Sequence, residues 1–480
     1  MNEYKIFVQR IGLVGIANLL VALSSLILLP ILTKNFSIDD YGIWVQINTT
    51  IALLPNLTTL GLPFTMVRFL SAETDKKIIQ EGFYSIFSMV LIATFIVSLL
   101  LLIFSKQIAL AIFNGNVNVA IILSAIVFLA CLNALLLNYF RTFQEMKKYS
   151  FFLLMQTYLG VAIVSYLALG GYGIYMVSLG LLIANFITFL AMFALIIWSI
   201  GFKIPKFRNI REYLSFGVPT IPGNLSSWIV NSSDRYVIGI FLSAAFVGYY
   251  SPGYTLGYSI SMLMAPFSLL LPSVLPQYYD KNNMEKVSSF LNYSTKYFLL
   301  VAIPAAFGLS ILSKPLLNVL TTPDIALNGY LITPITALST LIFGVYAIIS
   351  NVLVLEKKTK VIGTIWIIAA TMNLILNILL VPFFGIIAAA ATTLMAYIVA
   401  FIISLKFSTK FFNFDYKFIL KSITASTIMS AIILFINPQN LMNIIIAIVI
   451  SIIVYFGLIL VMKGIKQDEF KLFKAMFGKN

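Results

Sequence analysis

A row of polar side chains runs along one apolar stretch in the middle of the chain. The stretch, residues 213–241, is long enough to cross a bilayer. Its polar residues recur at steps of four, three, four and three, which places them on one face of a helix. They are Thr220, Asn224, Ser227, Asn231 and Asp234. The pattern predicts a helix with a wet face, able to hydrogen-bond a polar substrate, and a dry face.

The adjacent charges Asp234 and Arg235 lie near the end of that row. Each would cost about 2.5 to 3.5 kcal/mol inside a membrane if unaccompanied. One interpretation is a salt bridge that holds two helices together. The other, which the four further polar side chains on the same face favour, is a hydrated substrate path. In that case Arg235 contacts an anion, Asp234 is its partner or an ion-coupling group, and both project into water.

Two asparagines, Asn373 and Asn377, lie four residues apart in another apolar run, so they share a helix face. They can hydrogen-bond a neighbouring helix, which is the commoner role, or meet sugar hydroxyls. Asn133, Asn138 and Asn185 are expected to bond neighbouring helices in the same way.

Arginine is scarce in this lysine-rich chain, and three arginines lie at the ends of apolar runs: Arg10, Arg68 and Arg141. They can anchor helices at the membrane interface by snorkelling. Alternatively they receive an anionic head group, because guanidinium pairs with phosphate in a bidentate manner.

The composition indicates a membrane protein. Of its 480 residues 61% are hydrophobic and 10% charged, and the mean hydropathy is +1.02. The apolar runs predict fourteen transmembrane helices, because backbone groups in lipid must be satisfied within each span. The fold class is therefore an all-α polytopic membrane protein.

Several kinds of chemistry are missing from the sequence. It contains no histidine and one cysteine, Cys131, which excludes imidazole chemistry, an internal disulfide and a cysteine metal cluster. It has no phosphate-binding glycine loop and no nucleophile with a base. We therefore expect no cofactor, no metal and no enzymatic activity.

The basic residues report orientation. Of the 31 lysines and arginines, 27 fall in alternate connections between the predicted spans, and three fall in the others. This split predicts that both termini lie in the cytoplasm. The abundance of lysine and isoleucine is typical of an AT-rich bacterial genome, so we expect the membrane to be a bacterial cytoplasmic membrane. The split also explains the net charge of +15 without nucleic-acid binding. The opposite connections are too short to house a glycan polymerase or ligase.

Sequence markers recur at an offset of about 207 to 212 residues. Asp40-Tyr41-Gly42 pairs with Val247-Gly248-Tyr249, residues 144–148 pair with 355–358, and Tyr172-Gly173-Ile174 pairs with Phe384-Gly385-Ile386. The repeat predicts two six-helix lobes related as parallel repeats, at residues 1–212 and 213–412. Residues 413–480 would add two further helices and a cytoplasmic tail.

Six segments along the chain resemble the polysaccharide transporter family, the Wzx-type O-antigen and repeat-unit flippases of the multidrug, oligosaccharidyl-lipid and polysaccharide exporter superfamily. They are DDYGIW at 39–44, TLGLPFTMVRFLSAE at 59–73, NYFRTFQEMKKYS at 138–150, REYLSFGVPTIP at 211–222, SSDRYVIGIFLSAAFVGYYS at 232–251 and NLILNILLVPFFGIIAAAATTLMAY at 373–397.

This resemblance implies two lobes around a V-shaped cavity and alternating access. It implies transport of an oligosaccharide on undecaprenyl pyrophosphate from the cytoplasmic to the outer leaflet, for O-antigen or capsule synthesis. The partners would be this lipid-linked oligosaccharide, membrane lipid, and polysaccharide polymerase and chain-length proteins. The alternative is a multidrug or metabolite exporter of the same superfamily.

Overall fold

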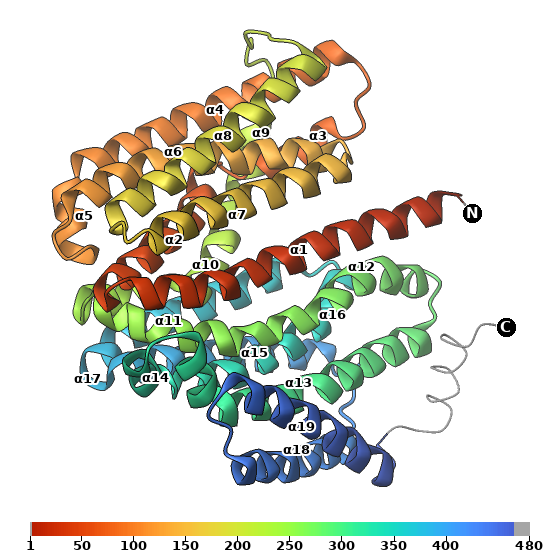
Figure 1. The fold of residues 1–480 in the computed structure, drawn as a ribbon. Helices are drawn as coiled ribbons and strands as arrows, with labels where there is room; N and C mark the ends of the chain where they lie inside the picture. The colour runs from red at the N-terminus through yellow and green to blue at the C-terminus, as the bar shows by residue number, and fades with distance from the viewer. Residues whose placement is uncertain (1, 465–480) are drawn as a thin grey trace. The chain divides into compact units, whose positions relative to one another are not determined.

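The computed structural model describes residues 2–464, with side chains from residue 12 onward. Within that range every regular element is a helix (Figure 1). The elements are α1 (Asn2–Asn35), α2 (Ile38–Thr58), α3 (Leu62–Leu70), α4 (Lys76–Ile103), α5 (Ser105–Ile112), α6 (Val117–Thr142), α7 (Met146–Leu169), α8 (Ile174–Ile200), α9 (Ile210–Gly217), the 3-10 helix η1 (Val218–Thr220), α10 (Ile221–Phe241), α11 (Ala244–Tyr258), the 3-10 helix η2 (Ser259–Met264), α12 (Ala265–Tyr279), α13 (Met284–Leu320), α14 (Pro323–Gly329), α15 (Ile332–Ile349), α16 (Asn351–Leu355), α17 (Thr359–Ser408), α18 (Tyr416–Ile436) and α19 (Leu441–Val461).

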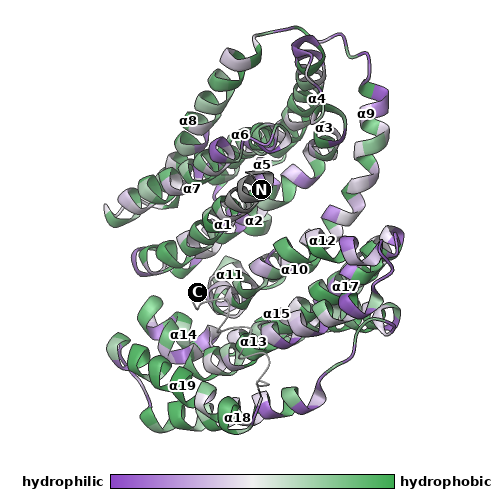
Figure 2. Ribbon diagram, turned by 90° about the vertical axis from the view of Figure 1, so that its right-hand side faces the viewer, coloured by the Kyte–Doolittle hydropathy of each residue, from purple (hydrophilic) through white to green (hydrophobic). Residues whose placement is uncertain are grey.

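Among the described residues, eleven helices are long and apolar enough to cross a membrane, and α2 with α3, bent by 51°, forms a twelfth candidate. Figure 2 shows hydrophobic residues along most of α4 and α19. The all-α polytopic architecture is thereby confirmed. The predicted count of fourteen is higher for two reasons. First, the polar helix α10 is not among the candidates. Second, the 50-residue α17 counts as one candidate although it contains a break at Gly385 (φ 64°, ψ −152°), where the sequence predicts two separate spans.

Short polar side chains fix where several helices begin. The side chains of Ser37, Asp75 and Asn116 accept backbone N–H groups in the first turns of α2, α4 and α6. Each satisfies one of the donors that a helix start leaves without a partner, which matters most in an apolar chain.

The chain divides into two compact units. The first comprises the described residues through Ser251 together with Trp366–Ala389. Its central helix is α6, which is mostly buried and contacts α2, α4, α7 and α8. The lone Cys131 is buried on this helix. Aromatic rings fill much of the core, and Phe83 packs on Tyr84, Phe87 and Tyr139.

Amide side chains tie three helices of this unit together. Asn133 of α6 donates to the backbone carbonyl of Asn185 of α8 at 3.0 Å, and Gln156 of α7 donates to the Asn185 side chain at 3.2 Å. Asn138 donates to the carbonyl of Pro63 at 2.9 Å. The prediction that these asparagines bond neighbouring helices is confirmed.

The second unit comprises Pro252–Ile365 and the described residues from Ala390 onward. Its central helix is the 37-residue α13, which contacts α12, α15, α18 and α19. Tyr455 links α19 to α13 and α18. Its hydroxyl donates to the carbonyl of Leu300 of α13 at 2.8 Å and lies 2.8 Å from the Ser422 hydroxyl of α18.

Two of the repeated sequence markers form the same turn. After α6, Gln144 has a φ of 57° and the N–H of Glu145 donates to Phe140. After α16, Lys357 has a φ of 58° and the N–H of Lys358 donates to Leu353. Both are helix endings closed by a residue in the left-handed conformation.

The third marker differs between its copies. Gly173 is extended, whereas Gly385 has a positive φ and interrupts α17. The lobe boundaries after residues 212 and 412 remain a prediction. The predicted cytoplasmic tail beyond residue 464 lies outside the described residues.

Candidate functional site

The polar row predicted from the sequence lies on α10. The helix begins directly after the 3-10 turn η1, and Pro219 and Pro222 occupy the starts of these two elements, where a missing N–H costs little. The hydroxyl of Thr220 donates a hydrogen bond to the carbonyl of Gly217 at 2.7 Å. Helix α10 packs against α2.

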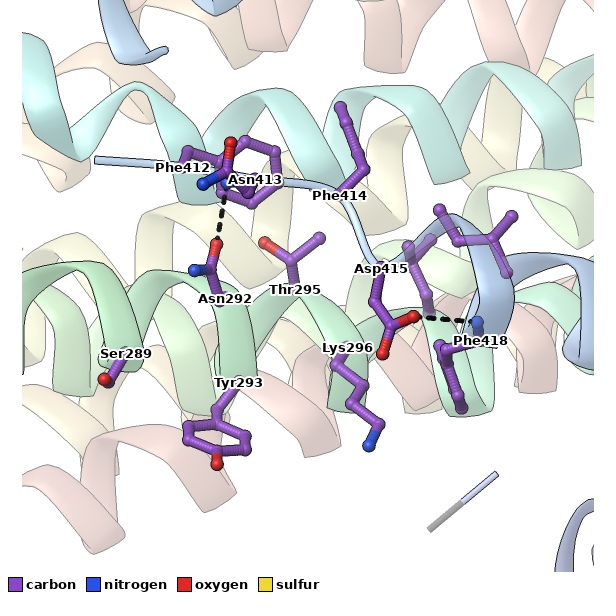
Figure 3. A pocket seen from close by; sticks show the side chains of 12 residues that line it. Ser289, Asn292, Tyr293, Thr295, Lys296, Phe412, Asn413, Phe414, Asp415 and Phe418 are labelled. Atoms are coloured by element: carbon purple, nitrogen blue, oxygen red, sulfur yellow. Dashed lines mark hydrogen bonds between the residues drawn. The ribbon is translucent and has the colours of Figure 1, made fainter. Parts of the chain in front are cut away.

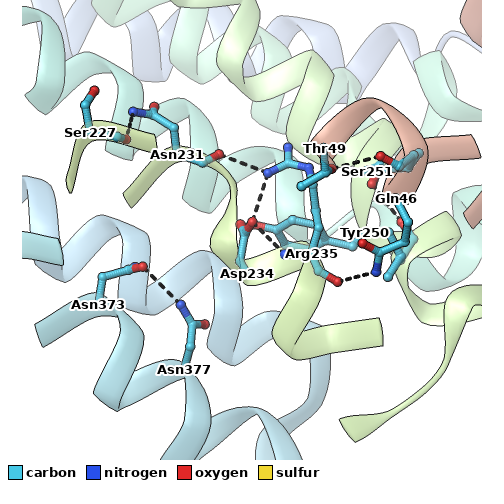
Figure 4. Close-up of polar contacts among 12 residues, drawn as sticks. Gln46, Thr49, Ser227, Asn231, Asp234, Arg235, Tyr250, Ser251, Asn373 and Asn377 are labelled. Carbon is cyan, nitrogen blue, oxygen red and sulfur yellow. Dashed lines mark hydrogen bonds and ion pairs between the residues drawn. The ribbon is translucent and has the colours of Figure 1, made fainter. Parts of the chain in front are cut away.

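Asp234 and Arg235 form an ion pair within α10 (Figure 4). One Arg235 guanidinium nitrogen lies 2.9 Å from Oδ1 of Asp234 and also donates to the carbonyl of Asn231 at 2.9 Å. The backbone N–H of Arg235 donates to the same carboxylate oxygen at 2.9 Å. The guanidinium is therefore held in one orientation by its own helix.

Tyr250 of α11 binds the other oxygen of this carboxylate. Its hydroxyl donates to Oδ2 of Asp234, and its ring centroid lies 5.7 Å from the Arg235 guanidinium carbon. A buried carboxylate needs such hydrogen bonds to both oxygens, because desolvating it otherwise costs several kcal/mol.

The two charges differ in exposure. The Asp234 side chain is 1% exposed, and the Arg235 side chain is 12% exposed. The expectation that the carboxylate projects into water is therefore wrong, because Tyr250 and Arg235 cover it. The pair of Asp234 and Arg235 joins neighbouring residues of α10 and not two helices.

Contacts from α2 fix the position of this cluster. Gln46 Nε2 donates to the carbonyl of Arg235 at 2.6 Å, and the hydroxyls of Thr50 and Tyr236 lie 2.6 Å apart. Gln46 reaches the backbone of α10 because Gly239 has no side chain in its way. Sequence reasoning missed Gln46, Thr50, Tyr236 and Tyr250. Gln46 lies 189 residues from Arg235, and no spacing rule links positions so far apart.

The rest of the row is less buried than Asp234. Thr220, Asn224, Ser227 and Asn231 are half-buried. Asn231 Nδ2 donates to the carbonyl of Ser227 at 2.7 Å, within the same helix. The apolar residues Leu225, Trp228 and Ile229 of the same stretch are half-buried as well, so burial does not separate the predicted wet face from the predicted dry face, and that division stays a prediction.

Asn373 and Asn377 lie together on α17 (Figure 4). Both are fully buried, and Asn377 Nδ2 donates to Oδ1 of Asn373 at 3.2 Å. Their burial favours a structural role within the protein over a direct contact with sugar hydroxyls.

Arg68 and Arg141 lie elsewhere in the same unit, in the last turns of α3 and α6. Both side chains are exposed, and the Arg68 guanidinium carbon lies 5.9 Å from the centroid of the Phe69 ring. Their guanidinium groups are therefore accessible to an anionic ligand, whereas the side chain of Asp234 is buried. The side chain of Arg10 lies outside the described residues.

Comparison with known families adds to this geometry. Residues 7–276 match the family described as polysaccharide biosynthesis protein, and residues 219–379 match the MatE family. The first match covers more than half of the chain and includes α10, Asp234 and Arg235.

Individual relatives are similar over part of the chain. A probable low-salt glycan biosynthesis flippase, Agl15 of Haloferax volcanii, is 27% identical over 203 residues, 42% of each chain. A probable flippase of the same organism, AglR, is 27% identical over 175 residues, 35% of each. The chain thus spans less than half the length of these relatives. In fold it resembles the lipid II flippase MurJ in its inward closed conformation, with a TM-score of 0.76, 21% identity, and coverage of 92% of this chain and 97% of that chain.

Proposed function

Because this chain belongs to the polysaccharide biosynthesis protein family, we propose that it is a flippase that moves a lipid-linked oligosaccharide across a membrane. The resemblance found in the sequence is confirmed by this membership. The names of the relatives and the fold shared with MurJ support the prediction of a transporter rather than an enzyme.

The observation that carries the proposal is the orientation of Arg235. An arginine inside a membrane helix, which α10 is in this proposal, is costly and marks a functional site by default. Here the guanidinium is held by Asp234 and by the Asn231 carbonyl, next to a row of half-buried amides and hydroxyls. Such an arrangement suits an anionic, hydroxyl-rich head group, because the cation is oriented before the ligand arrives.

Physical chemistry explains why such a head group needs a protein. Moving an unpaired hydroxyl from water into alkane costs about 4 to 8 kcal/mol, so several sugars together face tens of kcal/mol. A path lined with amides, hydroxyls and a fixed cation replaces part of the lost hydration. The hydrocarbon tail has no such barrier and can stay in lipid.

Within this proposal each predicted site residue has a role. Arg235 contacts the pyrophosphate or an acidic sugar, and the buried Asp234 positions Arg235 and balances its charge. Asn224, Ser227 and Asn231 contact sugar hydroxyls. Arg68 and Arg141, which are exposed, receive the anionic head group first. Asn373 and Asn377 are the buried support of the site.

The proposal also includes finer features. The carrier is undecaprenyl pyrophosphate, and the oligosaccharide is a repeat unit for O-antigen or capsule that moves from the cytoplasmic to the outer leaflet of a bacterial cytoplasmic membrane. The chain spans the membrane fourteen times with both termini cytoplasmic. Residues 1–212 and 213–412 are its two lobes, which alternate in access, and 413–480 add two helices and a tail. Polysaccharide polymerase and chain-length proteins are its partners.

The direct test uses proteoliposomes that contain a polyprenyl-pyrophosphate oligosaccharide with a periodate-sensitive sugar. The flippase should bring the inner-leaflet pool within reach of external periodate, whereas liposomes without protein should protect about half of the label. Protection that is unchanged by the protein would contradict the proposal. A labelled phospholipid in the same vesicles serves as the control. Its inner-leaflet pool should stay protected if the protein does not simply make the bilayer leak.

The alternative is a multidrug or metabolite exporter, which the MatE match over residues 219–379 favours. A cationic drug requires an accessible carboxylate. Asp234 is buried and already bonded to Arg235 and Tyr250, which disfavours that substrate class. Efflux of a cationic dye by the same vesicles, without movement of the oligosaccharide, would support the alternative.

A further inference from the structure

Trp228 shares a face of α10 with Arg235. It follows Asn224 by four residues and precedes Asn231 by three, and Arg235 comes four residues after Asn231. Steps of four, three and four place these side chains on one side of a helix. The indole ring therefore lies on the same side of α10 as the guanidinium that, in the proposed function, contacts the anionic part of the head group.

The Arg235 side chain brings its cation toward Trp228. The guanidinium donates to the carbonyl of Asn231 at 2.9 Å, so the side chain folds back toward the N-terminal end of α10. Asn231 and Trp228 are one turn apart, about 5 Å along the helix axis. The ring and the cation are thus neighbours on the helix surface, at a separation that a phosphate group and the sugar attached to it can bridge.

A second aromatic ring supports the indole. The ring centroids of Trp228 and Tyr236 lie 5.7 Å apart, with an angle of 50° between the ring planes. The Tyr236 hydroxyl lies 2.6 Å from the hydroxyl of Thr50, which ties this second ring to α2. Tyr236 therefore gives Trp228 a fixed neighbour to pack against.

Polar groups elsewhere in the chain show how such groups are usually satisfied. In the pocket between α13 and the start of α18, the backbone N–H of Asn413 donates to Oδ1 of Asn292 at 3.0 Å (Figure 3). In the same pocket Oδ1 of Asp415 accepts the backbone N–H of Phe418 at 3.0 Å and caps α18 (Figure 3). These polar groups have structural tasks, so they indicate no ligand.

The indole N–H of Trp228 has no hydrogen-bond partner in the part of the chain that the structure describes. Its nitrogen is enclosed by protein atoms, although the residue as a whole is half-buried. A buried tryptophan N–H usually finds an acceptor, and a buried donor without one is rare. Within the described residues no hydrogen bond fixes the ring, and a hydroxyl-rich ligand would supply the acceptor once the ring turns toward it.

The chemistry of a sugar suits these groups. A sugar ring carries C–H groups on its faces and hydroxyls around its rim, so it can lie on an aromatic ring and still form hydrogen bonds at its edges. Asn224 and Asn231 are half-buried and flank Trp228 on the same face, and amides both donate to and accept from hydroxyls. A purely aliphatic ligand would leave these polar groups unused.

We propose that Trp228 is a specificity-determining residue, on which the sugar next to the phosphate groups stacks while the indole N–H donates to an oxygen of that sugar. The inference rests on the proposed function and adds to it a division of tasks on α10. Arg235 contacts the anionic group of the carrier lipid, whereas Trp228 contacts the sugar. The transporter therefore distinguishes a carrier lipid that bears an oligosaccharide from the bare carrier lipid.

Two substrates test this division: a polyprenyl pyrophosphate with its oligosaccharide, and the same polyprenyl pyrophosphate without sugar. The Kd of each is measured by microscale thermophoresis with the full chain in nanodiscs. Trp228→Leu should raise the Kd of the glycosylated substrate about tenfold and leave that of the sugar-free substrate unchanged. Trp228→Phe keeps an aromatic ring and loses the N–H, so it should raise the first Kd only about threefold.

The outcomes separate this inference from the proposed function. If the wild type binds neither substrate, the proposed function fails, and the role of Trp228 fails with it. If the wild type binds the glycosylated substrate but Trp228→Leu binds it equally well, or weakens both substrates equally, the role of Trp228 is overturned and the proposed function stands.

Trp198→Leu is the matched control, because Trp198 belongs to α8 and is 86% exposed. This variant should leave both Kd values unchanged. If Trp228→Leu does not fold, the difference in tryptophan emission between the wild type and Trp228→Phe reports on Trp228 alone. A change in this difference with the glycosylated substrate and not with the sugar-free one supports the proposal, whereas no change, or the same change with both, contradicts it.

Discussion

Gly42 of α2 and Gly248 of α11 make reciprocal contacts. A Cβ on Gly42 would collide with the carbonyl of Ala244, four residues before Gly248, and a Cβ on Gly248 would lie 2.7 Å from the carbonyl of Ile38, four residues before Gly42. The two helices therefore meet backbone to backbone at Gly42 and Gly248. The internal repeat stays a prediction.

The crossing should not tolerate a methyl group. We expect Gly42→Ala to lower the thermal unfolding temperature by an amount that corresponds to about 1 to 3 kcal/mol, because backbone and not a flexible side chain must move. Gly363→Ala is the control, since a Cβ there meets nothing within 4 Å and alanine is the better helix former. Equal unfolding temperatures for Gly42→Ala and the wild type would rule out this close approach.

Gly239 and Gln46 form a pair in which one substitution should compensate for another. A Cβ on Gly239 would collide with Gln46 Nε2, so Gly239→Ala alone should destabilise the protein and displace the amide from the Arg235 carbonyl. In the double variant Gln46→Ala/Gly239→Ala the collision is absent. A double-mutant cycle of unfolding temperatures should therefore show a coupling of about 1 kcal/mol or more. Simple additivity of the two changes would mean that they do not touch.

The hydroxyl of Tyr250 should matter more than that of Tyr236. Tyr250→Phe removes a donor to the buried carboxylate of Asp234 and should cost about 1.5 to 3 kcal/mol. Tyr236→Phe removes a contact between two neutral hydroxyls, at 2.6 Å from Thr50, and should cost about 0.5 to 1.5 kcal/mol. Thermal unfolding of the two variants side by side provides the comparison, and the reverse order would argue against a charged Asp234.

Arg68 and Arg141 should affect uptake and not stability. Both are exposed, so Arg68→Gln and Arg141→Gln should change the free energy of unfolding by no more than about 0.5 kcal/mol. If they receive the head group, each variant should raise the substrate concentration needed for half-maximal flipping and leave the maximal rate nearly unchanged. If the double variant needs the same substrate concentration for half-maximal flipping as the wild type, both arginines are only interface anchors.

Much of the architecture could be predicted because membrane helices are recognisable in a sequence by their length and hydropathy. The exceptions have physical reasons. Helix α10 is too polar for a hydropathy test, and α17 continues through its break at Gly385. The asparagine contacts of α6 and α8 could be expected because an amide in hydrocarbon must find a partner.

The site was only partly predictable. Helical spacing identified the row on α10 and the pairing of Asp234 with Arg235, since both are local. It could not show that Tyr250 covers the carboxylate or that Gln46 reaches the Arg235 carbonyl, because these contacts depend on how α11 and α2 pack on α10. The expectation of a water-facing carboxylate failed for the same reason.

The central claim is that Arg235 contacts the anionic part of the transported head group. Arg235→Gln leaves Asp234 buried without a counter-charge, so the informative variant is the neutral pair Asp234→Asn/Arg235→Gln, alongside Arg235→Lys. The measurement is the initial rate of oligosaccharide flipping in proteoliposomes at matched protein content and unfolding temperature. We predict that the neutral pair loses about tenfold or more of the rate and that Arg235→Lys retains an intermediate rate. A folded neutral pair that flips the oligosaccharide at the wild-type rate would contradict the account.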